Sequence, residues 1–238
     1  MYIVSAMQTE VYEEIALWME NDTPDSRLYF LSGDSLSGKT TICRRLKANS
    51  KKFSVDVFYV NLLQMALHQD FIKVLYAGLG LGAQNAPRSM KLAVNMALAF
   101  FRDFNRVILI FDACLTMGFQ QSSEIQRFAK FVQSCASPDS NLRIIMVDYP
   151  DSHVSLLGAE AYGACGRKIN QWNDSVGFRK FLRLIFSKYG IVYPSDEDAL
   201  VSFVLAKTKG STGGVVNFCS GLKHEAGDSN FIYDKLWR

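Results

Sequence analysis

The chain has 238 residues, of which 49% are apolar and 21% charged, a balance that is typical of globular proteins and excludes wholesale disorder. No apolar run reaches the roughly 18 residues needed to span a bilayer, so we expect no membrane span. Five scattered cysteines form no CxxC pair and three distant histidines form no metal motif, which argues against disulfides and structural zinc. The odd number of isolated cysteines suits a reducing cytoplasm, and the first residues show no signal-peptide pattern, so a cytoplasmic protein is expected.

The formal net charge of +3 is unevenly distributed. Residues 39–102 carry ten basic and two acidic side chains, a net charge of +8, so the rest of the chain is acidic overall. Such asymmetry favours an anionic partner for the first third of the fold. The alternative is a solvated basic face that has no partner.

The first half of the predicted pattern begins with a helix over 9–20, whose apolar residues recur at helical spacing. A turn-rich stretch then leads into a short buried strand at 28–32 and a glycine-bearing loop at 33–38. A helix over 39–48 and a second strand at 55–61 follow. The pattern therefore predicts a strand, a glycine-bearing loop and a helix in direct succession over 28–48.

Two helices are predicted next, over 70–77 and 89–104. A strand at 106–112, a helix over 122–135 and a strand at 142–148 follow, and Ser122 or Ser123 is the expected N-cap of that helix. Because such apolar strands alternate with helices, the pattern predicts a parallel sheet covered on both faces. The fold class is therefore a doubly wound α/β domain.

After about residue 172 the pattern contains only helices, predicted over 175–189, 196–208 and 215–224. A small helical lid therefore follows the α/β domain. The last residues are rich in apolar side chains and read either as a segment that docks on its own core or as one that binds a partner. The three predicted parts are the core with its N-terminal helix, the lid and the docking segment, at 1–172, 173–226 and 227–238.

A phosphate-binding motif follows the first predicted strand. The pattern GxxxxGK[ST], the P-loop, is filled by Gly33, Asp34, Ser35, Leu36, Ser37, Gly38, Lys39 and Thr40, with Thr41 next. Glycines let backbone N–H groups turn toward phosphate oxygens, and the following helix adds its N-terminal dipole. Lys39 is expected to reach the β- and γ-phosphates, and Thr40 to bind Mg²⁺. The motif predicts ATP and Mg²⁺ as ligands, the alternative being a glycine-rich turn without a ligand.

Two acidic residues end the apolar strands that follow. Asp112 is the candidate Walker B carboxylate, which helps to hold Mg²⁺. Many such ATPases place a glutamate next, to polarise the attacking water, but Ala113 stands here and Glu124 lies further on in a helix. Asp148 either senses the γ-phosphate or positions water, or it is a solvated strand end. The sequence therefore favours nucleotide binding over rapid hydrolysis.

With these motifs in place, the chain resembles an AAA+ ATPase core, and that resemblance implies the sheet order 5-1-4-3-2. The stretch from Trp172 to Arg179 and the glycine-rich turn at 208–216 are similar to the TniB/TnsC group of transposition regulators, relatives of MuB. The resemblance implies an ATP-dependent, sequence-tolerant duplex-DNA-binding regulator of DNA transposition. Such a protein forms a homo-oligomeric ring or filament on target DNA and recruits transposase and target-selection proteins.

The same resemblance assigns DNA contact to the helical insert after the second strand. The candidate contacts there are Lys73, Arg88, Ser89 and Lys91, within the basic segment. Phosphate contacts of this kind give salt-sensitive binding without sequence preference. Each lysine taken alone is also compatible with a solvated charge.

Three departures from the family pattern point to slow hydrolysis: the acid after Asp112 is missing, a sensor-2 arginine is absent at Gly213 and Gly214, and the fourth strand ends differently. Arg167 matches the position of an arginine that, in this family, reaches the nucleotide of a neighbouring subunit. The alternative is that Arg167 is an ordinary surface charge. ATP then acts mainly as an assembly switch. The competing hypotheses are a regulatory ATPase of the ExeA/GspA or STAND type that acts on protein partners without DNA, and a small kinase.

Overall fold

The structure is a computed structural model that describes residues 6–21, 26–136, 140–161, 164–169, 172, 175–193 and 196–225. The docking segment predicted at 227–238 lies outside these residues. The chain divides into a larger compact unit, 11–32 with 39–168, and a smaller one, 1–10 with 33–38 and 169–238. Among the described helices none combines the length and the apolar character that crossing a bilayer requires.

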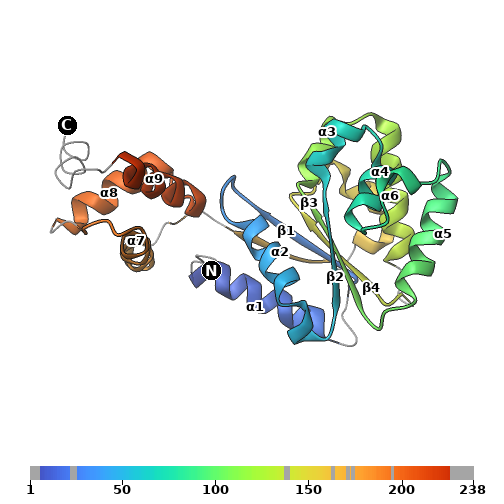
Figure 1. The fold of residues 1–238 in the computed structure, drawn as a ribbon, viewed down its shortest axis with the longest axis horizontal. Helices are drawn as coiled ribbons and strands as arrows, with labels where there is room; N and C mark the ends of the chain where they lie inside the picture. Colours follow the sequence, from blue (N-terminus) through green and yellow to red (C-terminus); the bar gives the residue numbers. More distant parts are fainter. Residues whose placement is uncertain are drawn as a thin grey trace. The chain divides into compact units, whose positions relative to one another are not determined.

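The larger unit is built on a five-stranded sheet (Figure 1). Its strands are β1 (Leu28–Gly33), β2 (Asp56–Asn61), β3 (Val107–Asp112), β4 (Leu142–Val147) and β5 (Cys165–Ile169). They lie in the order β2-β3-β4-β1-β5, and the pairs β2–β3, β3–β4 and β1–β4 are parallel. Read from the other edge, this is the expected order 5-1-4-3-2. The predicted fold class, a doubly wound parallel sheet of the P-loop type, is therefore confirmed.

Helices cover both faces of this sheet. Figure 1 shows α1 (Ala6–Glu20) and α2 (Lys39–Ala48) against one face, and α4 (Phe71–Gly78), α5 (Met90–Phe101) and α6 (Ser122–Cys135) against the other. Short segments connect them: α3 (Met65–His68) and the 3₁₀ turns η1 (Ser50–Phe53), η2 (Leu62–Gln64), η3 (Ala83–Asn85), η4 (Cys114–Phe119) and η5 (Asp151–Ala161). Because both faces are covered, all six residues of β3 and of β4 are buried.

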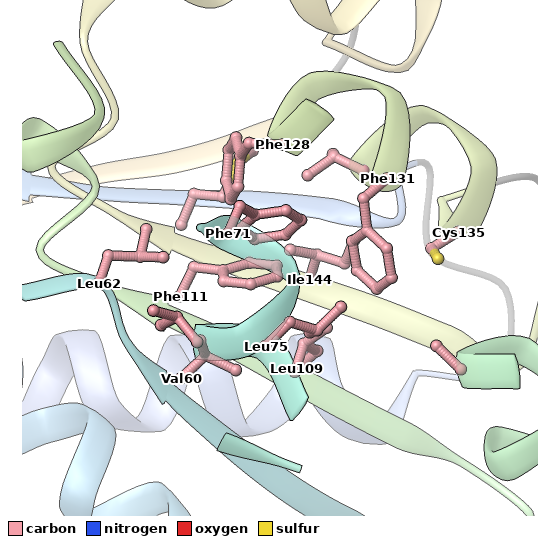
Figure 2. Close-up of a cluster of buried hydrophobic side chains, with 14 of the residues drawn as sticks. Val60, Leu62, Phe71, Leu75, Leu109, Phe111, Phe128, Phe131, Cys135 and Ile144 are labelled. Carbon is pink, nitrogen blue, oxygen red and sulfur yellow. The ribbon is translucent and has the colours of Figure 1, made fainter. Parts of the chain in front are cut away.

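The main core lies between the sheet and α4–α6 (Figure 2). Since side chains alternate along a strand, Leu109 and Phe111 of β3 point into this core. The Phe111 ring lies 5.0 Å from that of Phe128 and 6.0 Å from that of Phe71, in edge-on or tilted contacts that aromatic rings prefer. This packing fixes β3 firmly up to its last residue, Asp112.

Two arginines attach the end of α1 to the opposite face. Arg143 of β4 is fully buried, and its guanidinium donates hydrogen bonds to the carbonyl oxygens of Trp18, Met19 and Asn21. Arg106 donates to the carbonyls of Met19 and Glu20. The last carbonyls of a helix have no partner within it, and they carry partial negative charge. The two guanidinium groups supply hydrogen-bond donors to these carbonyls and place positive charge beside them.

The smaller unit contains a three-helix lid, formed by α7 (Ser175–Tyr189), α8 (Glu197–Thr208) and α9 (Thr212–Glu225). Trp172 precedes it and stacks on Phe181, with ring centroids 5.4 Å apart. Its indole N–H donates to Thr212 at 3.1 Å, and its backbone N–H to the carbonyl of Gly210 at 2.9 Å. The tryptophan thus ties the first lid helix to the turn before the last one.

Two details differ from the expectations. The N-cap of α6 is Gln121, without a side-chain capping bond, because the helix already includes Ser122 and Ser123. Strand β5 occupies a stretch for which no element was predicted. It is an edge strand, its middle residues are exposed, and its sequence CGRKI lacks the apolar run that marks the other four strands.

Candidate functional site

Polar side chains gather in the larger unit where β3 and β4 end and α2 begins. Because parallel strands end at one edge of the sheet, Asp112 and Asp148 are brought close to the first residues of α2. Both strand ends turn sharply: Ala113 has φ 61° and Asp148 has φ 56°, in the left-handed region. The backbone N–H of Asp148 donates to the carbonyl of Leu31 at 2.8 Å, which holds this turn beside the end of β1.

Lys39 and Asp148 form an ion pair, with Nζ 3.3 Å from Oδ2. The lysine side chain is 8% exposed and the aspartate side chain 28%. A cation this buried requires a counter-charge, and Asp148 supplies it. The ammonium group that the P-loop motif assigns to phosphate binding is therefore held in place by a carboxylate.

Asp112 accepts hydrogen bonds on both carboxylate oxygens. Its Oδ2 accepts from the Thr40 hydroxyl at 2.9 Å, and its Oδ1 from the backbone N–H of Ala113 at 2.9 Å. The structure thus brings together the two residues that the sequence paired as magnesium ligands. Thr41 lies half-buried in the same first turn of α2.

The third donor to Asp112 is a residue that the sequence analysis missed. The Tyr59 hydroxyl of β2 donates a short hydrogen bond to Oδ2. Burial, followed by this bond to Asp112, raises the pKa of the Tyr59 phenol. The alternation of side chains along the strands could have suggested this contact. Tyr59 pairs with Ile110, and Ile110 and Asp112 are two residues apart on β3, so Tyr59 and Asp112 share a face of the sheet.

A buried thiol lies beside the two carboxylates. Burial, and next the charges of Asp112 and Asp148, raise the pKa of Cys43 well above its usual value. Cys43 is therefore a neutral packing residue, as the sequence suggested.

The P-loop backbone, Gly33–Gly38, belongs to the smaller unit and is held from two directions. The side-chain amide of Gln8 in α1 donates to the carbonyl of Ser37 at 2.7 Å. The backbone N–H of Gly213, in the first turn of α9, donates to the carbonyl of Leu36 at 2.7 Å. These bonds hold two P-loop carbonyl groups and leave Leu36 in an unusual conformation, with φ 62°.

Both contacts depend on glycine. Gly38 has φ 98°, and a Cβ there would lie 1.8 Å from Nε2 of Gln8. A Cβ on Gly213 would lie 2.9 Å from both Cβ and O of Leu36. The glycine at 213 allows the lid helix to approach the loop backbone closely.

Of the remaining loop residues, Asp34, Ser35 and Leu36 are exposed and Ser37 is buried. The Ser37 N–H donates to the carbonyl of Asp34 at 3.2 Å, which closes a turn inside the loop. This arrangement leaves the outer residues of the loop accessible to a ligand.

Arg167 and Glu124 are engaged elsewhere. Nε of Arg167, on β5, lies 3.0 Å from Oε2 of Glu14, whose other oxygen accepts from Tyr29 at 2.7 Å. The Glu124 carboxylate accepts from the backbone N–H of Phe71 at 2.9 Å, at the start of α4, and pairs with Arg127. Glu124 is thereby committed to helix packing, whereas the Arg167 side chain remains 54% exposed.

The four predicted DNA contacts lie on α4 and at the start of α5. Lys73 is an exposed residue of α4, whereas Arg88 and Ser89 precede α5 and Lys91 lies in its first turn; all four are exposed. Lys91 also lines a groove of about 430 Å³ between α5 and α6, together with Lys130. Lys130 was not among the predicted contacts, and it is the second cation, after Lys91, that lines this groove.

The residues present suit magnesium, the metal that the motif implies. A threonine hydroxyl and a carboxylate within 2.9 Å of each other are hard oxygen donors of the kind Mg²⁺ prefers. Among the described residues, no group of three histidine, cysteine or acidic side chains could hold a metal by itself. A magnesium ion here therefore requires further ligands from water or a bound phosphate.

No protein-family model matches the sequence, and no curated protein does. Solved structures do match. A Walker-type ATPase of Pyrococcus abyssi is 16% identical, with a TM-score of 0.69 over 96% of this chain and 70% of its own. Cdc6p of Pyrobaculum aerophilum is 14% identical, with a TM-score of 0.65 over 94% and 64%.

A third match is the replication initiator DnaA bound to AMPPCP and single-stranded DNA, 13% identical, with a TM-score of 0.60 over 98% and 66%. This chain thus spans roughly two thirds of the length of such neighbours. Together with the sheet order and the P-loop, these matches define the fold as that of AAA+ P-loop ATPases. The neighbours are of the Orc/Cdc6/DnaA type, and the TniB/TnsC subgroup is not distinguished by them.

Proposed function

We propose that this chain is an ATP- and magnesium-binding AAA+ protein that binds duplex DNA and regulates transposition. The observation that carries the proposal is the meeting of Lys39, Thr40 and Asp112 at the carboxyl edge of the sheet, directly after a P-loop sequence. The DnaA neighbour, bound to AMPPCP and single-stranded DNA, supports binding of ATP and of DNA. The transposition role rests on the resemblance of the residues around Trp172 and Gly210.

Each site residue has a definite task in this proposal. The backbone N–H groups of the P-loop and the Lys39 ammonium bind the phosphates. Thr40 and Asp112 hold magnesium, which neutralises phosphate charge when it is bound. Asp148, the ion-pair partner of Lys39, is the candidate to sense the terminal phosphate or to position an attacking water.

Hydrolysis is slow in this proposal because Ala113 occupies the place of the expected glutamate. The next acid along the chain, Glu124, is committed to the start of α4. Arg167 is the candidate to act on a neighbouring subunit's nucleotide in a ring or filament, which requires it to leave Glu14. ATP would then act chiefly by favouring the assembled, DNA-bound state.

The DNA surface comprises Lys73, Arg88, Ser89 and Lys91. All four are exposed, and the two lysines and the arginine add positive charge within the segment of net charge +8. Contacts of this kind address phosphates and not base edges, so they give sequence-tolerant binding. That tolerance suits a protein that marks target sites for a transposase.

The deciding experiment measures binding of a labelled random duplex by fluorescence anisotropy, with ATP, with ADP and without nucleotide, over a salt series. We expect tight binding only with ATP, falling steeply with salt. Lys39→Ala should bind ATP at least about tenfold more weakly, because the phosphates lose their cation. Lys47→Ala is the matched control, an exposed lysine on the same helix.

The transposition role is tested separately, by strand transfer of a labelled element end into a target plasmid by the cognate transposase. Addition of this protein with ATP should raise insertion, and Lys39→Ala should not. ATP-dependent DNA binding without any effect on insertion would remove transposition while retaining the DNA-binding ATPase.

An exposed apolar stripe favours the second candidate, a regulatory ATPase of the ExeA/GspA or STAND type. Leu92 and Met96, one helical turn apart on α5, are 50% and 44% exposed. Exposed apolar side chains on one helix face suit a protein partner better than DNA. ATP binding without duplex binding in any nucleotide state would select this alternative.

A further inference from the structure

We propose that Tyr59 is a positioning residue that competes with magnesium for Asp112 and so sets the magnesium concentration at which nucleotide binds. The inference rests on the proposed nucleotide-binding function and adds a residue that no motif contains. Its basis is the convergence of three hydrogen-bond donors on one carboxylate.

The acceptor sites of the Asp112 carboxylate show why competition arises. Each carboxylate oxygen offers two lone pairs. Oδ1 accepts from the Ala113 N–H, whereas Oδ2 accepts from both Thr40 and Tyr59. Both acceptor positions of Oδ2 are therefore filled by hydroxyl groups. A magnesium ion, or a water molecule that it carries, can reach this oxygen only by displacing one of them.

The two hydroxyl donors are not equivalent. Thr40 uses its proton on Asp112 and keeps lone pairs for a metal, so its bond is compatible with magnesium. Tyr59 comes from β2, outside the P-loop, and its hydroxyl has no such role in the motif. Magnesium retains most of its water ligands in proteins, and these waters are themselves hydrogen-bond donors. The phenol therefore occupies the second acceptor position of Oδ2, the oxygen beside the Thr40 hydroxyl, where a magnesium-bound water would donate.

The phenol is also a persistent competitor. Strand β2 is paired along its whole length with β3, from Asp56 with Val107 to Asn61 with Asp112. This register holds the tyrosine at a fixed distance from the carboxylate. Displacement must come from a rotation of the side chain.

The test is a magnesium titration of the 238-residue chain with a fluorescent ATP analogue. Tyr59→Phe removes only the hydroxyl, and we expect the half-saturating magnesium concentration to fall about fivefold, the effect of one lost competing hydrogen bond. Analogue affinity measured in EDTA should stay unchanged. A merely structural role would instead change thermal stability or affinity under both conditions.

Tyr29→Phe is the matched control. Tyr29 also lies on a strand and donates to a carboxylate, that of Glu14, at 2.7 Å. Its removal should leave the magnesium requirement unchanged. Tyr59→Met, which also lacks the hydroxyl, should reproduce the phenylalanine result and guards against a folding defect in either variant.

The outcomes separate this inference from the function on which it rests. An unchanged or raised magnesium requirement in both Tyr59 variants would overturn the competition. Failure of the unaltered protein to bind the analogue at any magnesium concentration would instead overturn the proposed function itself.

Discussion

At the scale of single residues, the ion pair between Lys39 and Asp148 has the clearest functional consequence. A carboxylate 3.3 Å from the phosphate-binding lysine attracts the same ammonium group that a nucleotide requires. The negative charge of Asp148 also repels the phosphates. Asp148 therefore raises the free energy of the nucleotide-bound state relative to the empty one.

Neutralising this residue should strengthen nucleotide binding. We expect Asp148→Asn to lower the Kd for ATP by about fivefold in EDTA, a gain of about 1 kcal/mol. Isothermal titration calorimetry measures this directly. Asp56→Asn is the control. It removes an equal charge from an exposed residue at the start of β2, away from the strand ends that carry the site, and it should have no effect. Weaker binding by Asp148→Asn would mean that its carboxylate positions Lys39 or contacts phosphate favourably.

The candidate site was predictable where its residues are neighbours in sequence or end an apolar strand. Lys39 and Thr40 follow from the P-loop pattern, and Asp112 follows from the apolar strand before it. Tyr59 was not predictable in the same way, because its contact depends on the pairing of β2 with β3. The Glu14 partner of Arg167 lies more than 150 positions away in sequence, so no local pattern indicates it.

At the scale of elements, the attachment of α1 to the sheet depends on a residue inside β4. Arg143 is buried to 1% exposure and satisfies three carbonyl groups at the end of α1. Helix α1 contributes Val11, Ile15 and Met19 to the core, so loss of its anchor exposes apolar surface as well.

Replacing Arg143 should be strongly destabilising. We expect Arg143→Met to lower the free energy of unfolding by about 3 kcal/mol, because buried carbonyl groups lose their donors. This corresponds to a fall in Tm of roughly 6 to 12 °C by differential scanning calorimetry. Arg102→Met makes the same change at an exposed position and should alter stability by less than about 0.5 kcal/mol. A similar small effect at Arg143 would refute the anchoring role.

The elements themselves were largely predictable, for physical reasons that also explain the exceptions. Strands β3 and β4 are buried on both faces, and β1 is mostly buried over 28–31, so these strands carry the continuous apolar runs that pattern analysis detects. Strand β5 has an exposed middle, Gly166 to Lys168, and shows no such run. Its existence followed from the expected sheet order, but its position required the structure.

At the scale of the whole molecule, the distribution of charge separates specific contact from general attraction. The segment 39–102 contains basic residues on several elements, including α2, η1, α4 and α5. If only the surface of α4 and α5 meets DNA, the position of a charge change matters more than its size.

Reversing two charges on this surface should weaken duplex binding. We expect the double variant Lys73→Glu/Lys91→Glu to lose about two phosphate contacts, which reduces the magnitude of the slope of log K against log salt by roughly 2. Anisotropy over a salt series measures the slope. Lys51→Glu/Lys52→Glu changes the net charge equally on η1 and should leave the slope nearly unchanged. Equal losses in both variants would indicate non-specific attraction.

The bond between Gly213 and Leu36 has a practical consequence. Both partners are main-chain groups, so no side-chain substitution removes the donor unless it introduces proline, and no change of pH within the folding range titrates it. We expect the amide proton of Gly213 to exchange slowly with deuterium while the Leu36 carbonyl accepts it, and quickly once the loop rearranges. Exchange at this single amide therefore reports, without any added label, whether the hydrogen bond between α9 and the P-loop is intact.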